Sequence, residues 1–227
     1  MNYTELYNTI QTYTENQFPD VYLASGSTVS ATTQINMFIT QAEQRIYNSV
    51  QFPSLRRNVT GSTSTNNKYL ACPADFLATY SMAIETTDGQ EFLLNKDVNF
   101  IRQAYPKATD TATPKYYALF GPSYSNSTEL SFILGPTPDA AYTMELHYFF
   151  YPESITTSNT SWLGDNFDSV LLYGSLVEAY TFMKGEVDII SGYDMKYKEA
   201  LALAKRLGDG MERQDAYRSG QFRQAVT

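Results

Sequence analysis

Hydrophobic positions near the N-terminus repeat at helical intervals. Leu6, Ile10 and Tyr13 lie three and four residues apart, which predicts a short amphipathic helix over residues 2–16 that Phe18-Pro19 closes. A stronger helical pattern follows the loop ASGSTVS and stops before Pro53. Its apolar positions are Ile35, Phe38, Ile39, Ala42, Ile46 and Val50. Each helix has one apolar face and therefore needs a partner.

Two further helical patterns lie in the C-terminal part of the chain. The first is expected to start at a cap formed by Asp165 or Asn166 and to end at Gly185. Its apolar positions predict a wide buried stripe: Val170, Leu171, Leu176, Val177, Tyr180 and Met183. The second is expected to start near Ser191 and to stop at Gly208 and Gly210. Its apolar face holds Tyr193, Tyr197, Ala200, Leu201, Ala204 and Leu207.

Between these helices the pattern changes to the alternation that is typical of strands. Tyr80–Glu85 alternate, and Asp88-Gly89 gives a hairpin signal before the next strand. Residues 97–104 predict a short helix. Further strands are expected over residues 115–120, 129–134 and 142–150, separated by turns rich in Gly and Pro.

This order of elements predicts an α+β fold in which an antiparallel β domain, a meander or a small sandwich, is inserted into a helical bundle. The bundle would comprise residues 1–53 and 163–210, and the β domain residues 54–162 with one short helix. Residues 211–227 lack an apolar period and are expected to form a flexible C-terminal arm. The passage from Phe132 to Met183 runs from strand to helix without a catalytic motif. It is interpreted as the joint between the two domains.

Composition adds an unusual wealth of tyrosine. The 227 residues include 19 Tyr and 13 Phe but one Trp, and a tyrosine surplus favours protein interfaces or sugar-binding surfaces. A β-rich fold alone is the simpler explanation of the same composition. The net charge of −8 argues against nucleic acid as the principal ligand, although DNA could slide past an acidic wall without sticking.

Candidate chemistry is sparse. The chain has no phosphate-binding loop, HExxH or Gly-x-Ser-x-Gly motif, and one His and one Cys leave no zinc cluster, so no cofactor or metal is expected. Cys72 is expected to be an inert packed residue. His147 lies in a strand with its side chain opposite to that of Leu146, which favours a structural or surface role. A signal peptide and a membrane span are not expected.

Carboxylates give only weak hints of catalysis. Asp165 and Asp168 lie at a helix start, where capping explains them. A hydrolase assembled around His147 from distant carboxylates such as Glu85 and Glu145 remains a third and weaker hypothesis.

The C-terminal arm carries residue types that anchor interfaces. Its arginines recur every five residues and alternate with aromatic side chains, and the set comprises Arg213, Tyr217, Arg218, Phe222 and Arg223. An arm that becomes ordered in a partner's groove would use them; the alternative is a solvated tail that binds nothing.

The segments TPKYYALFG, LSFILGPTPDAAYTMELHYFFYP and WLGDNFDSVLLYGSLVEAYTFM carry a family resemblance. In this order of elements the chain resembles the head-to-tail adaptor, or connector, proteins of short-tailed bacteriophages, over roughly residues 2–206. The shared motifs are Pro-x-Pro before an aromatic strand, a Trp-Leu pair, and Leu-Leu-x-Tyr-Gly in the following helix.

The resemblance implies a structural virion protein without catalysis, assembled in the host cytoplasm. It implies a homo-oligomeric ring, a dodecamer in the relatives, between the portal protein and the tail nozzle protein, with DNA passing transiently through the channel. In the relatives the helical part faces the portal, the β domain faces the tail, and tail fibres attach near the ring in some of them. Residues 211–227 would dock between portal subunits, through the five side chains named above.

One alternative function is a carbohydrate-binding β-rich module of a phage or bacterial surface protein. Exposed loop tyrosines such as Tyr124 would then stack on sugar rings.

Overall fold

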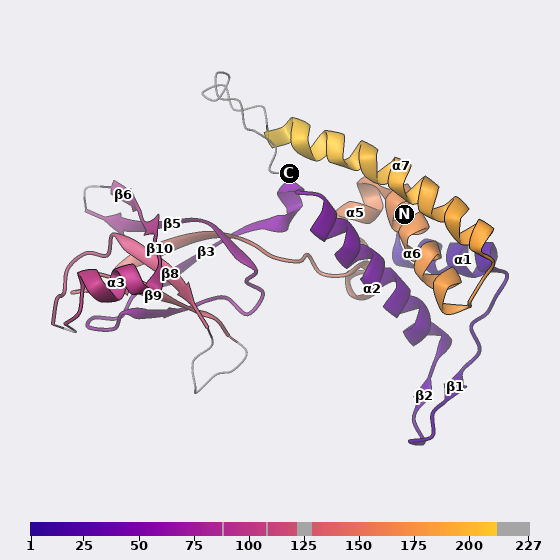
Figure 1. The fold of residues 1–227 in the computed structure, drawn as a ribbon, viewed down its shortest axis with the longest axis horizontal. Helices are drawn as coiled ribbons and strands as arrows, with labels where there is room; N and C mark the ends of the chain where they lie inside the picture. The colour runs from indigo at the N-terminus through magenta and orange to yellow at the C-terminus, as the bar shows by residue number, and fades with distance from the viewer. Residues whose placement is uncertain (88, 108, 122–128, 213–227) are drawn as a thin grey trace. The chain divides into compact units, whose positions relative to one another are not determined.

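The chain folds as two units, of which the first is discontinuous in sequence (Figure 1). The computed structural model describes residues 1–87, 89–107, 109–121 and 129–212, and for 208–212 the backbone alone. The first unit combines Met1–Ser54 with Pro152–Thr227, and the second is Leu55–Tyr151. Helices dominate the first unit and antiparallel sheets the second, which confirms the predicted α+β class with an inserted β domain.

The first unit contains the helices that the sequence patterns predict and several short elements. Its helices are α1 (Tyr3–Thr14), α2 (Ala31–Ser49), α4 (Ile155–Ser158), α5 (Trp162–Asn166), α6 (Asp168–Phe182) and α7 (Val187–Glu212). Asn2 and Glu5 form a capping box at the start of α1, where each side chain accepts a hydrogen bond from the other's backbone N–H. The strands β1 (Val21–Tyr22) and β2 (Thr28–Val29) pair as a hairpin before α2.

Helix α6 is the centre of this unit. It packs against α1, α2, α5 and α7. Eight of its own residues are buried: Val170, Leu171, Leu172, Gly174, Ser175, Leu176, Val177 and Ala179. The sequence predicted an amphipathic helix with one stripe, so the observed burial is broader. Gly174 permits the close approach, because a Cβ there would lie 3.2 Å from the Ala42 Cβ and 3.3 Å from the Tyr197 ring.

The predicted cap of this helix is wrong. Neither Asp165 nor Asn166 caps α6, whose N-cap position is Phe167 without a side-chain hydrogen bond. The hydroxyl of Ser161 instead accepts a hydrogen bond from the N–H of Gly164 at 3.0 Å and starts the short α5. Phe167 separates α5 from α6: its backbone is not helical (φ −139°, ψ 48°), and its ring packs against Phe52 and Trp162.

The last helix is longer than predicted. It starts at Val187, before Ser191, and continues through Gly208 and Gly210 to Glu212. A helical glycine costs only about 1 kcal/mol relative to alanine, so isolated glycines between good helix formers do not end a helix. The predicted arm at 211–227 therefore loses its first two residues to α7.

The segment 152–162 also differs from the prediction that placed it in the β domain. It belongs to the helical unit. Its side chain Ile155 is fully buried there, and the Ile155 N–H donates a hydrogen bond to the buried carboxylate of Glu43 on α2 at 3.0 Å.

The second unit is a sandwich of two four-stranded sheets. The first sheet has the order β3-β10-β5-β6, with β3 (Arg56–Ser62), β10 (Thr143–Phe149), β5 (Ala78–Thr86) and β6 (Gly89–Phe92). The second has the order β4-β9-β8-β7, with β4 (Tyr69–Ala71), β9 (Ser131–Gly135), β8 (Tyr116–Phe120) and β7 (Leu94–Asn95). The pair β7–β8 is parallel and the other pairs are antiparallel. A short 3-10 helix, η1 (Pro53–Leu55), precedes β3.

One apolar core is shared by the two sheets. Of the two predicted arrangements, a meander or a small sandwich, the structure therefore has the sandwich. Met82, Ile84 and Leu146 from the first sheet pack with Phe132 and Leu134 from the second. Helix α3 (Val98–Ala104), capped by Asp97, covers β8 and β9 through Ile101.

Candidate interaction surfaces

His147 lies on the exposed polar face of the first sheet. Its Nε2 is 3.1 Å from the Glu145 carboxylate, which also accepts a hydrogen bond from the Gln90 amide at 2.7 Å. The His147 and Gln90 hydrogen bonds hold the pKa of Glu145 below its usual range. A carboxylate that is already hydrogen-bonded and ionised stabilises the neighbouring strands.

Cys72 is buried in the sandwich core. Burial raises the pKa of its thiol to about 12, so it stays protonated at neutral pH and is a poor nucleophile. Within the described part of the chain, no group of three or more His, Cys, Asp and Glu residues could hold a metal ion.

A charged network lies at one edge of the sandwich. Asp75 accepts a hydrogen bond from the Tyr148 hydroxyl at 2.9 Å and from Arg57 at 2.8 Å. Burial raises the pKa of Asp75, but the hydrogen bonds from Tyr148 and Arg57 outweigh it and lower the pKa overall. Asp75 therefore ties the edge strand β3 to the core tyrosine of β10.

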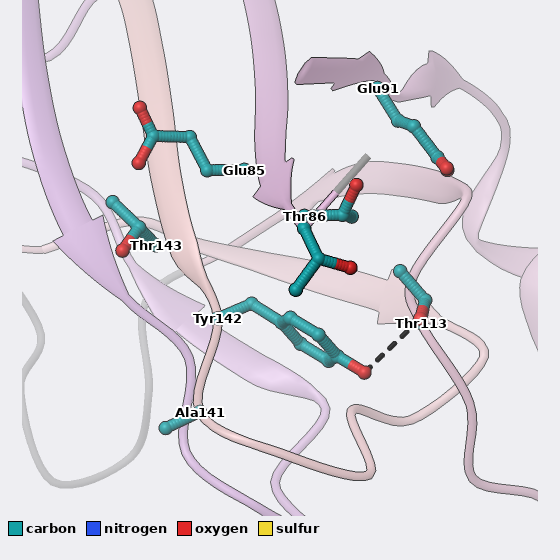
Figure 2. Close-up of a pocket in the computed structure, with 8 residues that line it drawn as sticks. Glu85, Thr86, Glu91, Thr113, Ala141, Tyr142 and Thr143 are labelled. Carbon is teal, nitrogen blue, oxygen red and sulfur yellow. Dashed lines mark hydrogen bonds between the residues drawn. The ribbon is translucent and has the colours of Figure 1, made fainter. Parts of the chain in front are cut away.

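A polar hollow of about 560 Å³ opens at the β5–β6 end of the sandwich (Figure 2). Its lining comprises Glu85, Thr86, Thr87, Glu91, Thr113, Ala141, Tyr142 and Thr143. The Tyr142 hydroxyl is committed to hydrogen bonds with Thr113 at 3.1 Å and Asp139 at 2.6 Å. Figure 2 shows the carboxylates of Glu85 and Glu91 pointing in different directions, so they do not form a paired acid and base.

Half-buried tyrosines gather where α1, α6 and α7 meet. The ring of Tyr193 lies 5.1 Å from that of Tyr180, 6.3 Å from Tyr173 and 6.5 Å from Tyr13. Burial, followed by the neighbouring Tyr180, raises the pKa of Tyr193 to about 12. Tyr13 is 44% exposed, so part of this cluster is accessible to a partner that fits aromatic side chains.

The β1–β2 hairpin projects from the helices of its unit (Figure 1). Gln34 is buried at its base, and the side-chain amide donates hydrogen bonds to the carbonyls of Pro19 at 3.1 Å and Val29 at 3.4 Å. Tyr22 on β1 is 80% exposed. Residues 24–30 were predicted only as a loop, although the β-forming residues on either side of Ser25-Gly26 are a hairpin signal.

The side chains predicted for the portal interface lie outside the described residues. They are Arg213, Tyr217, Arg218, Phe222 and Arg223, and the loop tyrosine Tyr124 also lies outside.

Comparison with known proteins gives one match that spans both units. The model of the family described as SU10 adaptor protein matches residues 1–225. A search of curated proteins finds no match to the chain. In the described residues no helix has the length and apolar character needed to cross a membrane.

Proposed function

Because the chain belongs to the SU10 adaptor protein family of phage head-to-tail adaptors, and is thus a virion component, we propose that it forms the ring between the portal protein and the tail nozzle. DNA would pass through the channel of this ring. Twelve copies, as the sequence resemblance implies, and assembly in the host cytoplasm are part of the proposal. The protein would act by binding its neighbours, without catalysis.

The match over residues 1–225 is the observation that carries this function. It includes residues of both the helical unit and the inserted sandwich, so the match is not limited to one unit. The surfaces support a binding role, because the conspicuous groups are exposed aromatic and apolar side chains on ordered elements.

The charge of the chain fits a channel through which DNA moves without being held. A net charge of −8 repels the phosphate backbone, whereas a protein that binds DNA tightly releases counterions through clustered Lys and Arg. Contact with DNA would therefore be transient.

Each unit would meet a different partner. The helical unit would face the portal and the sandwich the nozzle, with tail fibres as further neighbours. Residues 213–227 would dock between portal subunits through Arg213, Tyr217, Arg218, Phe222 and Arg223. Arg and Tyr side chains account for a large share of binding energy when they are buried in an interface.

Reconstitution with the phage's portal protein tests the proposal. The full chain should form a ring on the portal that electron microscopy resolves, and a chain ending at Glu212 should bind at least about tenfold more weakly. A chain with residues 213–227 in scrambled order keeps composition and charge, and is the matched control for sequence-specific docking.

Two results would contradict the proposal. A full chain that ignores the portal and is missing from purified virions would exclude the adaptor ring. Equal binding by the full and shortened chains would exclude only the docking role of residues 213–227.

A further inference from the structure

The edge of the sandwich formed by β6 and β7 differs from the edge formed by β3 and β4. On one side, the strand from Gly89 to Asn95 belongs to both sheets, since β6 pairs in the first sheet and β7 in the second. This strand closes the sandwich at that side. On the other side, β3 and β4 are separate edge strands of the two sheets, and neither continues into the other.

The open side contains an apolar cavity of about 270 Å³ between the two edge strands. Its lining comprises Val59, Thr60, Gly61, Leu70, Ala71, Cys72, Pro73, Met144 and Leu146. Most of β3 is exposed, and among the described residues it pairs only with β10. An exposed edge of this length with an apolar hollow beside it is a template for another strand.

The closed side presents a strand with the complementary features. Phe92 is 69% exposed and Leu94 is 58% exposed, although both are large apolar side chains. The described residues of β6 pair only with β5. An apolar strand with a free backbone edge is also unusual unless something covers it.

Strand direction agrees with pairing between β6 and β3. Three antiparallel steps separate β3 from β6, so β6 of one molecule would lie antiparallel to β3 of the next and would extend the sheet without a break.

We propose that the sandwich is an assembly module in which the strand Gly89–Asn95 of one copy pairs with the open β3/β4 edge of a second copy. The contact is head-to-tail, because it uses two different surfaces, and such contacts build rings when the rotation closes. This inference rests on the proposed ring and identifies the surface that would link its subunits.

A complementation experiment with two single substitutions tests the pairing. Phe92→Lys puts a charge on the closed edge, and Gly61→Lys puts one on the open edge, where a side chain meets no atom within 4 Å in the monomer. Phe100→Lys, an exposed phenylalanine on α3 of the same unit, is the matched control. Circular dichroism and the thermal midpoint show that each variant is folded.

Sedimentation equilibrium up to about 1 mM protein gives the readout. Wild type and Phe100→Lys should self-associate, and each edge variant alone should associate at least about tenfold more weakly. An equimolar mixture of the two edge variants should form a 1:1 dimer and stop there, because each retains one intact edge.

Three results would overturn the pairing. They are a monomeric wild type at the highest concentration, edge variants that assemble like wild type, or a mixture that gives no dimer. Portal binding and presence in virions, measured separately, would still hold in these cases if the adaptor function is correct.

Discussion

At the scale of single residues, the buried carboxylate of Glu43 is the least expected feature. It lies on α2 between apolar positions, is 2% exposed, and accepts the hydrogen bond from the Ile155 N–H. Burial raises the pKa of Glu43 and outweighs the hydrogen bonds from Ile155 and Ser154, which lower it. The folded protein therefore binds this proton more tightly than the unfolded chain does.

The pKa of Glu43 predicts how stability depends on pH. Between the unfolded pKa of about 4.3 and the higher folded value, the folded state carries the extra proton, so stability decreases as pH rises through that interval. Glu43→Gln keeps a hydrogen-bond acceptor and should remove this decrease. Urea unfolding from pH 4 to 7 should give similar stability at pH 4 and a more stable variant at pH 7.

The same substitution at exposed Glu199 on α7 is the control for Glu43→Gln. A stability difference between Glu43→Gln and wild type that stays constant across the pH range would contradict the prediction. Glu43→Ala should be less stable than Glu43→Gln by about 1–3 kcal/mol, because it leaves the buried Ile155 N–H without an acceptor.

The sequence predicts buried apolar residues well and buried polar residues poorly. The apolar periodicity identified the buried positions Leu6, Ile10, Phe38 and Ile46 correctly. It could not identify the buried polar residues Gln34 and Glu43, because a pattern of apolar positions assigns polar side chains to solvent. Their partners, Pro19, Val29 and Ile155, become neighbours only in the folded chain.

At the scale of elements, the packing of α6 depends on one glycine. Gly174→Leu should force α2 and α7 away from α6, and should destabilise the helical unit by about 1–3 kcal/mol or more. Gly192→Leu on α7 is the matched control, because a Cβ there meets no atom within 4 Å and leucine is the better helix former. Thermal unfolding should show a lower midpoint for Gly174→Leu and an equal or higher one for Gly192→Leu.

The β1–β2 hairpin gives a second prediction for an element. Gln34→Leu should leave the carbonyls of Pro19 and Val29 without their side-chain donor and loosen the hairpin. Hydrogen exchange should accelerate at residues 20–30 while the amides of α6 stay protected. Gln41→Leu, at an exposed position of the same helix, should leave exchange unchanged. Unchanged protection in Gln34→Leu would show that the strands alone hold the hairpin.

Helices and strands were largely predictable as elements, but their ends were not. The predicted start of α6 was wrong because the ring of Phe167 packs against Phe52 and Trp162 and separates α5 from α6. The local sequence does not show this packing. The predicted end of α7 at Gly208 and Gly210 was wrong because glycine is only a weak signal for the end of a helix. The hairpin was missed because each of its strands has two residues.

At the scale of the whole molecule, the ends of the second unit lie side by side. The Phe150 N–H donates a hydrogen bond to the Leu55 carbonyl at 3.0 Å, so a short linker could replace the sandwich without stretching the chain. The order of helices and strands predicted an insertion. The strand order β3-β10-β5-β6 was not predictable, because β3 and β10 are far apart in sequence and several partners fit the same alternation.

We expect the two units to fold independently of each other. A fragment of residues 55–151 should give the same amide NMR spectrum as in the full chain, except near its ends, because its core lies within the fragment. A chain in which a Gly-Ser linker replaces 55–151 should keep its helical circular dichroism. An unfolded fragment at 25 °C would show that the sandwich needs the helices.

The central position of α6 has a consequence for synthesis on the ribosome. Helices α1 and α2 are made first, yet the helix that covers their apolar faces follows the entire sandwich in the chain. The sandwich can therefore fold while α1 and α2 still expose Ile10, Phe38 and Ile46 to solvent. Nascent chains stalled before residue 168 should bind chaperones that recognise apolar segments, and chains released after α6 should not.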